Sequence, residues 1–450
     1  MSRRVPASLL RDATERAIRF LEGIDARPVA PRGLEALDRL RHPLPDNESD
    51  PAETLRVLDE VVGPATMAMP GGRFFGFVIG GALPVTVAAS WLATAWDQNA
   101  GLWAPTPGVA ALEEVALAWL VDVLGLPAGT GAGFVTGATV ANLTCLSAAR
   151  HAVLERAGWK VEADGLFGAP PITVVLGAEA HPTLFKSLGL LGLGRQRVVR
   201  VPVDGQGRMR REMLPPIAGP TIVCAQAGNV NSGAVDPLGP LVEHAHAGGA
   251  WVHVDGAFGL WAAASPTLRA LVAGIEGADS WATDAHKWLN VPYDNGIAFV
   301  RDVHALRGAM AITAEYLPTD TPHRNPSDHT PELSRRARGV EVWAALRTLG
   351  RQGLAEMIER TCRHARRFAE GLAAAGFEIL NEVVLNQVVV SFGDAAKNER
   401  VIAALQAEGT CWAGGTVWQG RAAMRISVSS WATTESDVEA SLAAILRVAR

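Results

Sequence analysis

Short apolar runs alternate with helical stretches through the middle of the chain. Continuous apolar strands that are separated by helices are typical of a mostly parallel sheet covered on both faces. We therefore predict an α/β fold whose sheet has seven strands. The predicted strands are 133–136, 172–176, 197–203, 221–227, 251–254, 280–283 and 296–300.

Both ends of the chain have a different pattern. The start is rich in proline and charge, with helical spacing near 7–24 and 50–62. The end has a polar loop, a long helical region at 340–375 and further short strands and helices. We expect three parts, namely an N-terminal arm (1–70), a large domain (71–317) and a smaller C-terminal α+β domain (318–450).

Residues 74–96 carry no charge and are long enough to cross a bilayer. Gly76, Gly80, Gly81 and Pro84 interrupt the segment, so we predict that it is buried or lines a pocket. The N-terminus shows no apolar signal core. We expect no membrane partner and a cytoplasmic location.

Composition excludes several kinds of protein. With 46 acidic and 41 basic residues, the formal net charge is −5, which provides no basic surface for nucleic acid. Four cysteines are scattered without a CxxC motif, so we predict neither a disulfide framework nor a metal site. We expect reduced and largely buried thiols.

Lysine is scarce in this chain, and each lysine therefore merits attention. Only Lys160, Lys186, Lys287 and Lys397 are present, which leaves 41 − 4 = 37 arginines. A lysine amine can lose its proton and attack a carbonyl, whereas arginine cannot. Lys287 follows the predicted strand 280–283 directly, so a Schiff-base lysine competes with the alternative of a surface charge.

Polar residues follow other predicted strands in the same way. Asp255 ends an apolar strand and precedes small residues, which places a carboxylate at the carboxyl edge of the sheet, where ligands bind in open α/β folds. The alternative is an acid that caps the next helix. His181 follows the strand 172–176, and its alternative is an ordinary structural histidine.

Residues 134–142 form a strand that enters a helix through small residues. Backbone N–H groups at a helix N-terminus, together with the Thr139 hydroxyl, make a seat for phosphate. The nearby glycines, Gly131, Gly133 and Gly137, have neither the spacing nor the position of a dinucleotide fingerprint. The sequence therefore predicts a phosphate-bearing ligand other than a dinucleotide.

These elements together resemble the group II pyridoxal-phosphate-dependent amino acid decarboxylases, which have the aspartate aminotransferase fold (fold type I). The resemblance extends over about 73–434 and includes 73–77, 103–107, 112–114, 137–142, His181, 228–237, 253–257, 286–288, 316–317, 334–336 and Arg425. It implies the cofactor pyridoxal 5′-phosphate, an amino acid substrate and a homodimer with shared active sites.

The resemblance also implies a role for each matching residue. Lys287 would hold the cofactor covalently, Asp255 would pair with its pyridinium nitrogen, and His181 would stack on the ring and orient the substrate carboxylate. The other expected cofactor contacts are Gly137, Ala138, Thr139, Asn229, Ala257 and His286. The expected substrate contacts are Gly80, Gly81, Trp103 and Arg425.

Tyr316 bears most directly on the type of reaction. In the family, a tyrosine at the matching place lies in a loop over the partner subunit's site and protonates Cα; the alternative is a packing tyrosine. We therefore expect an L-amino acid α-decarboxylase, with an aromatic or apolar substrate. Transamination, an oxygen-consuming deamination that yields an aldehyde, and a non-catalytic binding protein remain as alternatives.

Overall fold

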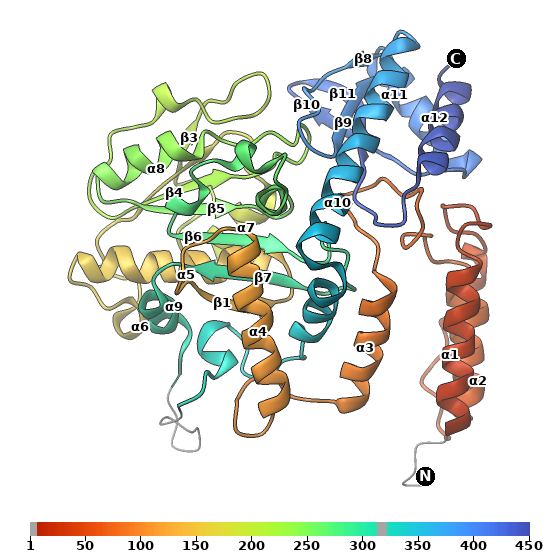
Figure 1. Ribbon diagram of the computed structural model, residues 1–450, viewed down its shortest axis with the longest axis horizontal. Helices are drawn as coiled ribbons and strands as arrows, with labels where there is room; N and C mark the ends of the chain where they lie inside the picture. Colours follow the sequence, from red (N-terminus) through yellow and green to blue (C-terminus); the bar gives the residue numbers. More distant parts are fainter. Residues whose placement is uncertain (1–6, 313–321) are drawn as a thin grey trace.

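A seven-stranded sheet forms the centre of the computed structural model, which describes residues 7–312 and 322–450 (Figure 1). The strand order is β1-β7-β6-β5-β4-β2-β3, and only β7 runs opposite to the others. The strands are β1 Gly131–Val135, β2 Thr173–Gly177, β3 Val198–Val201, β4 Thr221–Gln226, β5 Trp251–Asp255, β6 Ser280–Asp284 and β7 Gly296–Val300. All seven predicted strands are present, and the predicted α/β fold is confirmed.

Helices cover both faces of this sheet, as continuous apolar strands require. Side chains of α5, α7 and α9 form the apolar layer on one face, and those of α4, α8 and α10 form it on the other. The helices of the large domain are α3 Pro84–Trp96, α4 Pro107–Val123, α5 Ala138–Arg156, α6 Val161–Asp164, α7 Pro182–Leu190, α8 Leu238–Ala247 and α9 Val303–Met310. Short 3-10 helices lie at Leu34–Leu40, Arg211–Met213, Gly259–Ala264, Arg269–Val272, Ile275–Gly277 and Pro326–His329.

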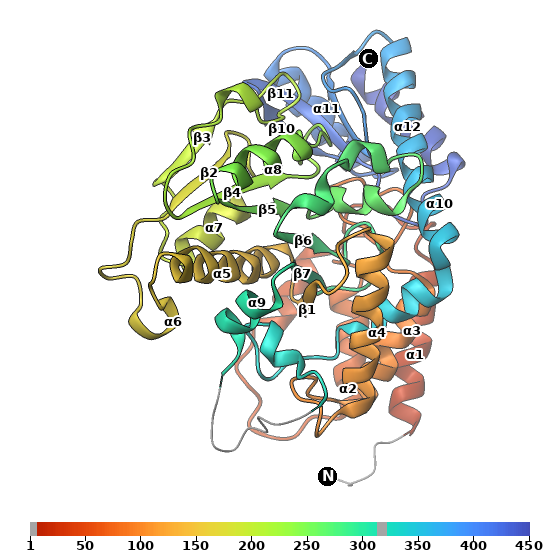
Figure 2. The ribbon, with the colours of Figure 1, turned by 60° about the vertical axis from the view of Figure 1, so that its left-hand side comes forward.

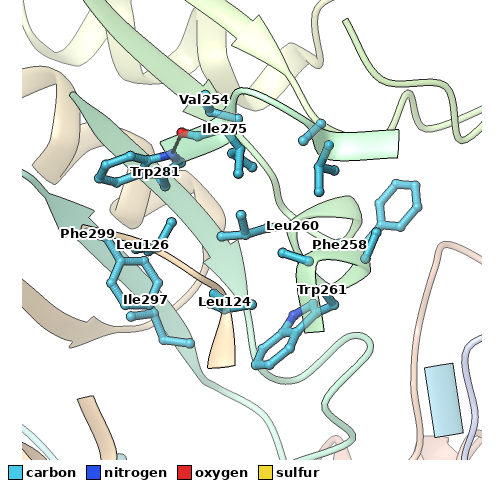
Figure 3. Packing of buried hydrophobic residues seen from close by; sticks show 14 of the residues in the cluster. Leu124, Leu126, Val254, Phe258, Leu260, Trp261, Ile275, Trp281, Ile297 and Phe299 are labelled. Carbon is cyan, nitrogen blue, oxygen red and sulfur yellow. Dashed lines mark hydrogen bonds between the residues drawn. The ribbon is translucent and has the colours of Figure 1, made fainter. Parts of the chain in front are cut away.

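Tryptophans in the core hold the end of β6 in place (Figure 3). Trp281 and Trp261 are fully buried, and each indole N–H finds a carbonyl. Trp281 donates to Ile275 O at 2.9 Å, and Trp261 donates to Asp284 O at 3.0 Å. A buried indole that lacked a partner would be costly, so these bonds fix the backbone at Ile275, before β6, and at Asp284, where β6 ends.

The C-terminal unit begins with the long helix α10, Gly339–Ala374, which is interrupted at Gly350 (φ 59°). A four-stranded antiparallel sheet follows in the order β10-β11-β9-β8. Its elements are β8 Glu378–Ile379, β9 Gln387–Ser391, α11 Ala395–Glu408, β10 Gly414–Trp418, β11 Arg421–Ser427 and α12 Glu435–Ala449. The predicted smaller α+β unit is therefore present.

The arm helices lie apart from the seven-stranded sheet, beside α3 and below the C-terminal unit in both views (Figures 1 and 2). They are α1 Ala7–Glu22 and α2 Pro51–Val57, which continues as a π-helical turn over Leu58–Val62. Arg16 joins α1 to Asp59 at 2.7 Å. No side chain of α1 is buried.

The expectation that 74–96 is buried or lines a pocket is correct for its first part, where Phe77 and Val78 line a pocket, and wrong for one side of α3. Phe74 and Phe75 are buried, but Trp91, Leu92 and Trp96 of α3 are 42%, 54% and 47% exposed. Helix α3 carries apolar residues around its whole circumference, but it packs only one side against the rest of the chain. Its opposite side therefore exposes apolar side chains to solvent. Within the part of the chain that the structure describes, no helix is long and apolar enough to span a membrane.

The four thiols are free and buried, as predicted. Burial raises the pKa of Cys362 and of Cys411 to about 12, and it raises the pKa values of Cys145 and Cys224 further. Across 7–312 and 322–450, no group of three His, Cys, Asp or Glu side chains is placed to hold a metal ion.

Candidate active site

A pocket opens at the carboxyl ends of the parallel strands, where the sequence places its polar residues. It contains about 770 Å³ of empty space, part of it open to solvent. The lining residues are Phe77, Val78, Gly137, Ala138, Thr139, His181, Thr183, Gln226, Gly228, Val230, Asp255, Ala257, Phe258, Asp284, His286 and Lys287. Most of the predicted cofactor contacts therefore meet in one place.

Lys287 lies three residues after the end of β6. Its Nζ is 2.9 Å from Oδ2 of Asp284, the last residue of that strand. His286 lies alongside, with Nε2 3.5 Å from the other oxygen of Asp284. The backbone N–H of Asn295 donates to Nδ1 of His286 at 3.0 Å, so the neutral ring carries its proton on Nε2. Burial lowers the pKa of His286 despite the nearby carboxylate.

The N-terminus of α5 binds an anion supplied by the chain itself. The N–H of Ala138 donates to Oδ1 of Asp284 at 2.6 Å, at the first residue of a 19-residue helix. Gly296 of β7 must be small here, because a Cβ on it would meet the backbone of Gly137 at 2.4 Å. The site therefore favours negative charge, as the predicted phosphate seat requires.

Asp255 ends β5 and is 5% exposed. Its Oδ2 accepts from Nδ2 of Asn142 at 3.2 Å, and its Oδ1 accepts from the N–H of Ala257 at 3.2 Å. Two donors thus hold the carboxylate in one orientation at the pocket wall, as expected of a group that must meet a ring nitrogen.

His181 caps α7 and lines the same pocket. Its Nδ1 accepts from the N–H of Thr183 at 3.3 Å and lies 2.7 Å from the Thr183 hydroxyl. The ring proton of neutral His181 is therefore on Nε2. Burial lowers the pKa of His181, the charge of Asp255 opposes this effect, and Lys287 and Arg425 add to it.

Arg425 projects from β11 and is half-buried. Its Nη1 lies 3.4 Å from Oδ1 of Asn231, and no carboxylate in the described ranges forms an ion pair with it. Burial lowers the pKa of its guanidinium. A cation in this position is suited to an anionic group that enters from outside.

Several predicted contacts lie outside the pocket lining. A side chain at Gly80 would meet the carbonyl of Lys287 at 1.9 Å, so this glycine allows two backbones to approach closely. The N–H of Gly81 donates to Asn290, and Trp103 stacks on His323 with ring centroids 3.9 Å apart. Gly80 and Gly81 are not among the described residues that line the pocket, and their role as substrate contacts stays a prediction.

Asn229 also turns away from the pocket. Its amide donates to Glu179 at 3.1 Å, and its carbonyl accepts from the N–H groups of Asn231 and Ser232. These bonds build the turn that carries Gly228 and Val230 to the lining, so the side chain shapes the pocket without facing it. Tyr316 lies outside the described residues, and its role stays a prediction.

Sequence reasoning missed the partner of Lys287. Asp284 stood in the same motif but received no role, although its place at a strand end was a usable signal. Gln226 ends β4 and lines the pocket for the same reason. Phe77 contributes an apolar wall; it received no role of its own, although it falls in the segment 74–96 that we predicted to be buried or to line a pocket.

Comparison with known proteins identifies the family. The model of the pyridoxal-dependent decarboxylase conserved domain matches residues 56–392. The chain belongs to this family. It is an enzyme family of amino acid decarboxylases, and its cofactor is pyridoxal 5′-phosphate.

Related proteins cover nearly the whole chain. Tryptophan decarboxylase 1 of Oryza sativa subsp. japonica is 29% identical over 94% of this chain and 89% of its own length. L-2,4-Diaminobutyrate decarboxylase of Rhizobium meliloti (strain 1021) is 31% identical over 82% of this chain and 76% of its own length. The crystal structure of Oryza sativa TDC with PLP and tryptamine has a TM-score of 0.91 at 25% identity, covering 100% of this chain and 99% of that one.

The pocket of this decarboxylase-family chain fits the cofactor. The helix end at Ala138 already holds a carboxylate oxygen, so it suits a phosphate. Lys287 is the one lysine that lines the pocket, and Asp255 presents an oriented carboxylate. These observations agree with the cofactor that the family uses.

Proposed function

We propose that the protein is an L-amino acid α-decarboxylase that takes substrates with an aromatic or apolar side chain and releases carbon dioxide and the amine. The observation that carries the proposal is the convergence of Lys287, Asp255 and His181 on one pocket. Arg425 is close enough to affect the pKa of His181, and it supplies a cation that has no carboxylate partner in the described ranges.

Each of these residues has a task that its surroundings support. When bound, pyridoxal phosphate supplies an electron sink for the pair left at Cα. Lys287 attaches the cofactor, and Asp255 keeps a proton on the pyridine nitrogen. The Ala138 end of α5 seats the phosphate. His181 covers the ring and, with Arg425, orients the substrate carboxylate.

The pocket chemistry supports an apolar substrate side chain. Its titratable residues are Lys287, Asp284, Asp255 and the two neutral histidines. Each of them either has one of the tasks above or contacts another of these residues. Phe77, Val78 and Phe258 supply apolar walls. An uncharged side chain can use these walls, whereas a charged side chain would be desolvated without a partner.

We also propose that the active form is a homodimer. Apolar side chains of α1 and α3 are exposed, including Leu10 at 58% and Leu92 at 54%. Trp103, expected near substrate, is not among the described residues that line the pocket. A second copy that covers α1 and α3 would bury these apolar faces and complete the site.

An amino acid panel tests the reaction. Each substrate is incubated with purified holoenzyme, and carbon dioxide, amine, aldehyde and keto acid are measured. We expect carbon dioxide and amine in equal amounts from an aromatic or apolar amino acid. A requirement for a keto acid would indicate transamination, and aldehyde with oxygen uptake would indicate oxidative deamination; either result overturns the proposal.

Tyr316→Phe tests the last proton transfer of this proposal. The resemblance assigns Tyr316 the proton that reaches Cα after carbon dioxide leaves, and phenylalanine keeps the ring but lacks that proton. We expect carbon dioxide release to continue while the amine yield falls and aldehyde and oxygen uptake rise. If Tyr316→Phe makes amine as fast as the wild type, Tyr316 is a packing residue.

A further inference from the structure

A line of buried polar side chains stands behind Asp255, outside the pocket. Successive residues of a strand alternate in direction, so Trp251, His253 and Asp255 point from β5 toward the same face. Ser280 of β6 lies opposite His253 in the sheet register. Asn142 belongs to α5, which covers this face. None of these four supporting residues lines the pocket.

A continuous chain of hydrogen bonds joins the four residues to Asp255. Trp251 Nε1 is 2.9 Å from Ser280 Oγ, and Ser280 Oγ is 3.0 Å from His253 Nδ1. His253 Nε2 is 2.8 Å from Asn142 Oδ1, and Asn142 Nδ2 is 3.2 Å from Asp255 Oδ2. Ser280, His253 and Asn142 are fully buried.

The two ends of this line fix the direction of every bond. A carboxylate only accepts, so Asn142 presents its amide N–H to Asp255 and its carbonyl to His253. His253 must then carry its proton on Nε2, which leaves Nδ1 to accept from the Ser280 hydroxyl. At the other end, the indole of Trp251 only donates, and its N–H meets the free lone pair of Ser280.

A neutral His253 suits this arrangement because one of its ring nitrogens donates and the other accepts. Burial lowers the pKa of His253 to about 3, so its ring is neutral near pH 7. A charged ring would direct two N–H groups outward and break the order at Ser280. A surface histidine would lack this constraint.

We propose that Asn142, His253, Ser280 and Trp251 are positioning residues that hold the Asp255 carboxylate in one rotamer as a hydrogen-bond acceptor for the cofactor's ring nitrogen. The inference rests on the role proposed for Asp255. Asn142 and the N–H of Ala257 each take one side of the carboxylate, so its remaining lone pairs face the pocket. Chained hydrogen bonds polarise one another, which strengthens the donor that reaches Asp255.

The decisive measurement is the ¹⁵N chemical shift of the ring nitrogen in holoenzyme that is loaded with ¹⁵N-labelled pyridoxal phosphate. In the wild type we expect a protonated nitrogen. In Asn142→Leu we expect the signal to move toward that of neutral pyridine. We also expect kcat to fall about tenfold while the substrate KM changes less than about twofold.

A pair of substitutions at His253 separates positioning from simple filling of space. His253→Gln can still offer an N–H to Asn142, so we expect a ¹⁵N shift close to that of the wild type. His253→Leu has no donor and should resemble Asn142→Leu. Ser427→Ala is the control, because it likewise breaks a hydrogen bond between two buried side chains (to Gln387, 2.6 Å), but in the C-terminal sheet. We expect it to leave the ¹⁵N shift unchanged.

Three outcomes decide the matter. A shifted ¹⁵N signal in Asn142→Leu and His253→Leu, restored in His253→Gln, supports the inference. A wild-type signal in all three variants overturns it, even if their melting temperatures fall, and leaves the role of Asp255 intact. A neutral ring nitrogen in the wild type itself overturns the role of Asp255 and the inference with it.

Discussion

The floor of the pocket buries polar side chains, whereas the outer side of α3 exposes apolar side chains. At the floor, polar groups lie in the interior, and Asp255, Asp284 and Lys287 all have partners within the chain. On α3, apolar Trp91 and Leu92 lie at the surface, where 42% and 54% of each side chain stays exposed. One chain therefore completes the cofactor side of the site, and we expect a second copy to complete the substrate side.

The largest effect is expected at the floor. Lys287→Ala removes the amine that attaches the cofactor, so we expect decarboxylation to fall by at least about 10³-fold and the visible absorption of the bound cofactor to disappear. Absorption spectra and carbon dioxide release measure both. Lys186→Ala, an exposed lysine on α7, is the control. Cofactor that borohydride still fixes to Lys287→Ala would show that another lysine binds it.

Asp255→Ala should have the next largest effect. The variant keeps Lys287 and the phosphate seat, so cofactor binding should persist, but the ring nitrogen loses the carboxylate that holds its proton. We expect kcat to fall by about 10²-fold or more. Steady-state kinetics with saturating cofactor measures this, and near-normal turnover would remove Asp255 from the mechanism.

Leu92→Arg tests the other half of the comparison. A charge in the middle of the exposed face of α3 should prevent burial of that face against a second copy, because an unpaired charge is costly to desolvate. We expect sedimentation to show monomers and activity to fall by about tenfold or more. Phe167→Arg changes an equally apolar side chain that is 99% exposed elsewhere. A wild-type protein that is monomeric and active would refute the proposed dimer.

Asp284→Asn should have the smallest effect. Whether cofactor binding becomes tighter or weaker shows which role Asp284 has. Asparagine can still accept from the Ala138 N–H, but it removes a negative charge from the seat of a phosphate. We expect pyridoxal phosphate to bind about fivefold more tightly, as the dissociation constant of the apoprotein measures. Asp302→Asn is the control, because Asp302 likewise caps a helix, α9. Weaker binding would mean that Asp284 serves mainly to hold Lys287.

Much of the fold was predictable because its signals are local. Most strands of the large sheet are largely apolar and buried, Asp255 ends β5, and Lys287 follows shortly after β6. β10 was not predicted, because its sequence begins with two glycines and its burial is mixed. The bonds of Asn142 to Asp255 and His253 join residues more than 100 positions apart, so they depend on how α5 packs on β5.

Gly80 and Gly81 also show that local sequence patterns do not reveal contacts between distant parts of the chain. Gly80 and Gly81 were expected to contact substrate because the resemblance to the decarboxylase family implies it for this segment. In the structure, Gly80 is small because the backbone of Lys287 passes beside it, a contact that no pattern around residue 80 reveals. The two glycines were noticeable in the sequence, but only the packing against Lys287 explains why residue 80 must be small.

The buried thiols have a practical consequence for labelling. Maleimides and iodoacetamides react with accessible thiolates, and burial keeps all four native thiols both covered and protonated at neutral pH. A single cysteine introduced on the surface is therefore the one fast-reacting site, without any need to remove native residues first. A fluorophore at such a position away from α1 and α3, for example at the 99% exposed residue 167, would report subunit exchange in an otherwise unaltered protein.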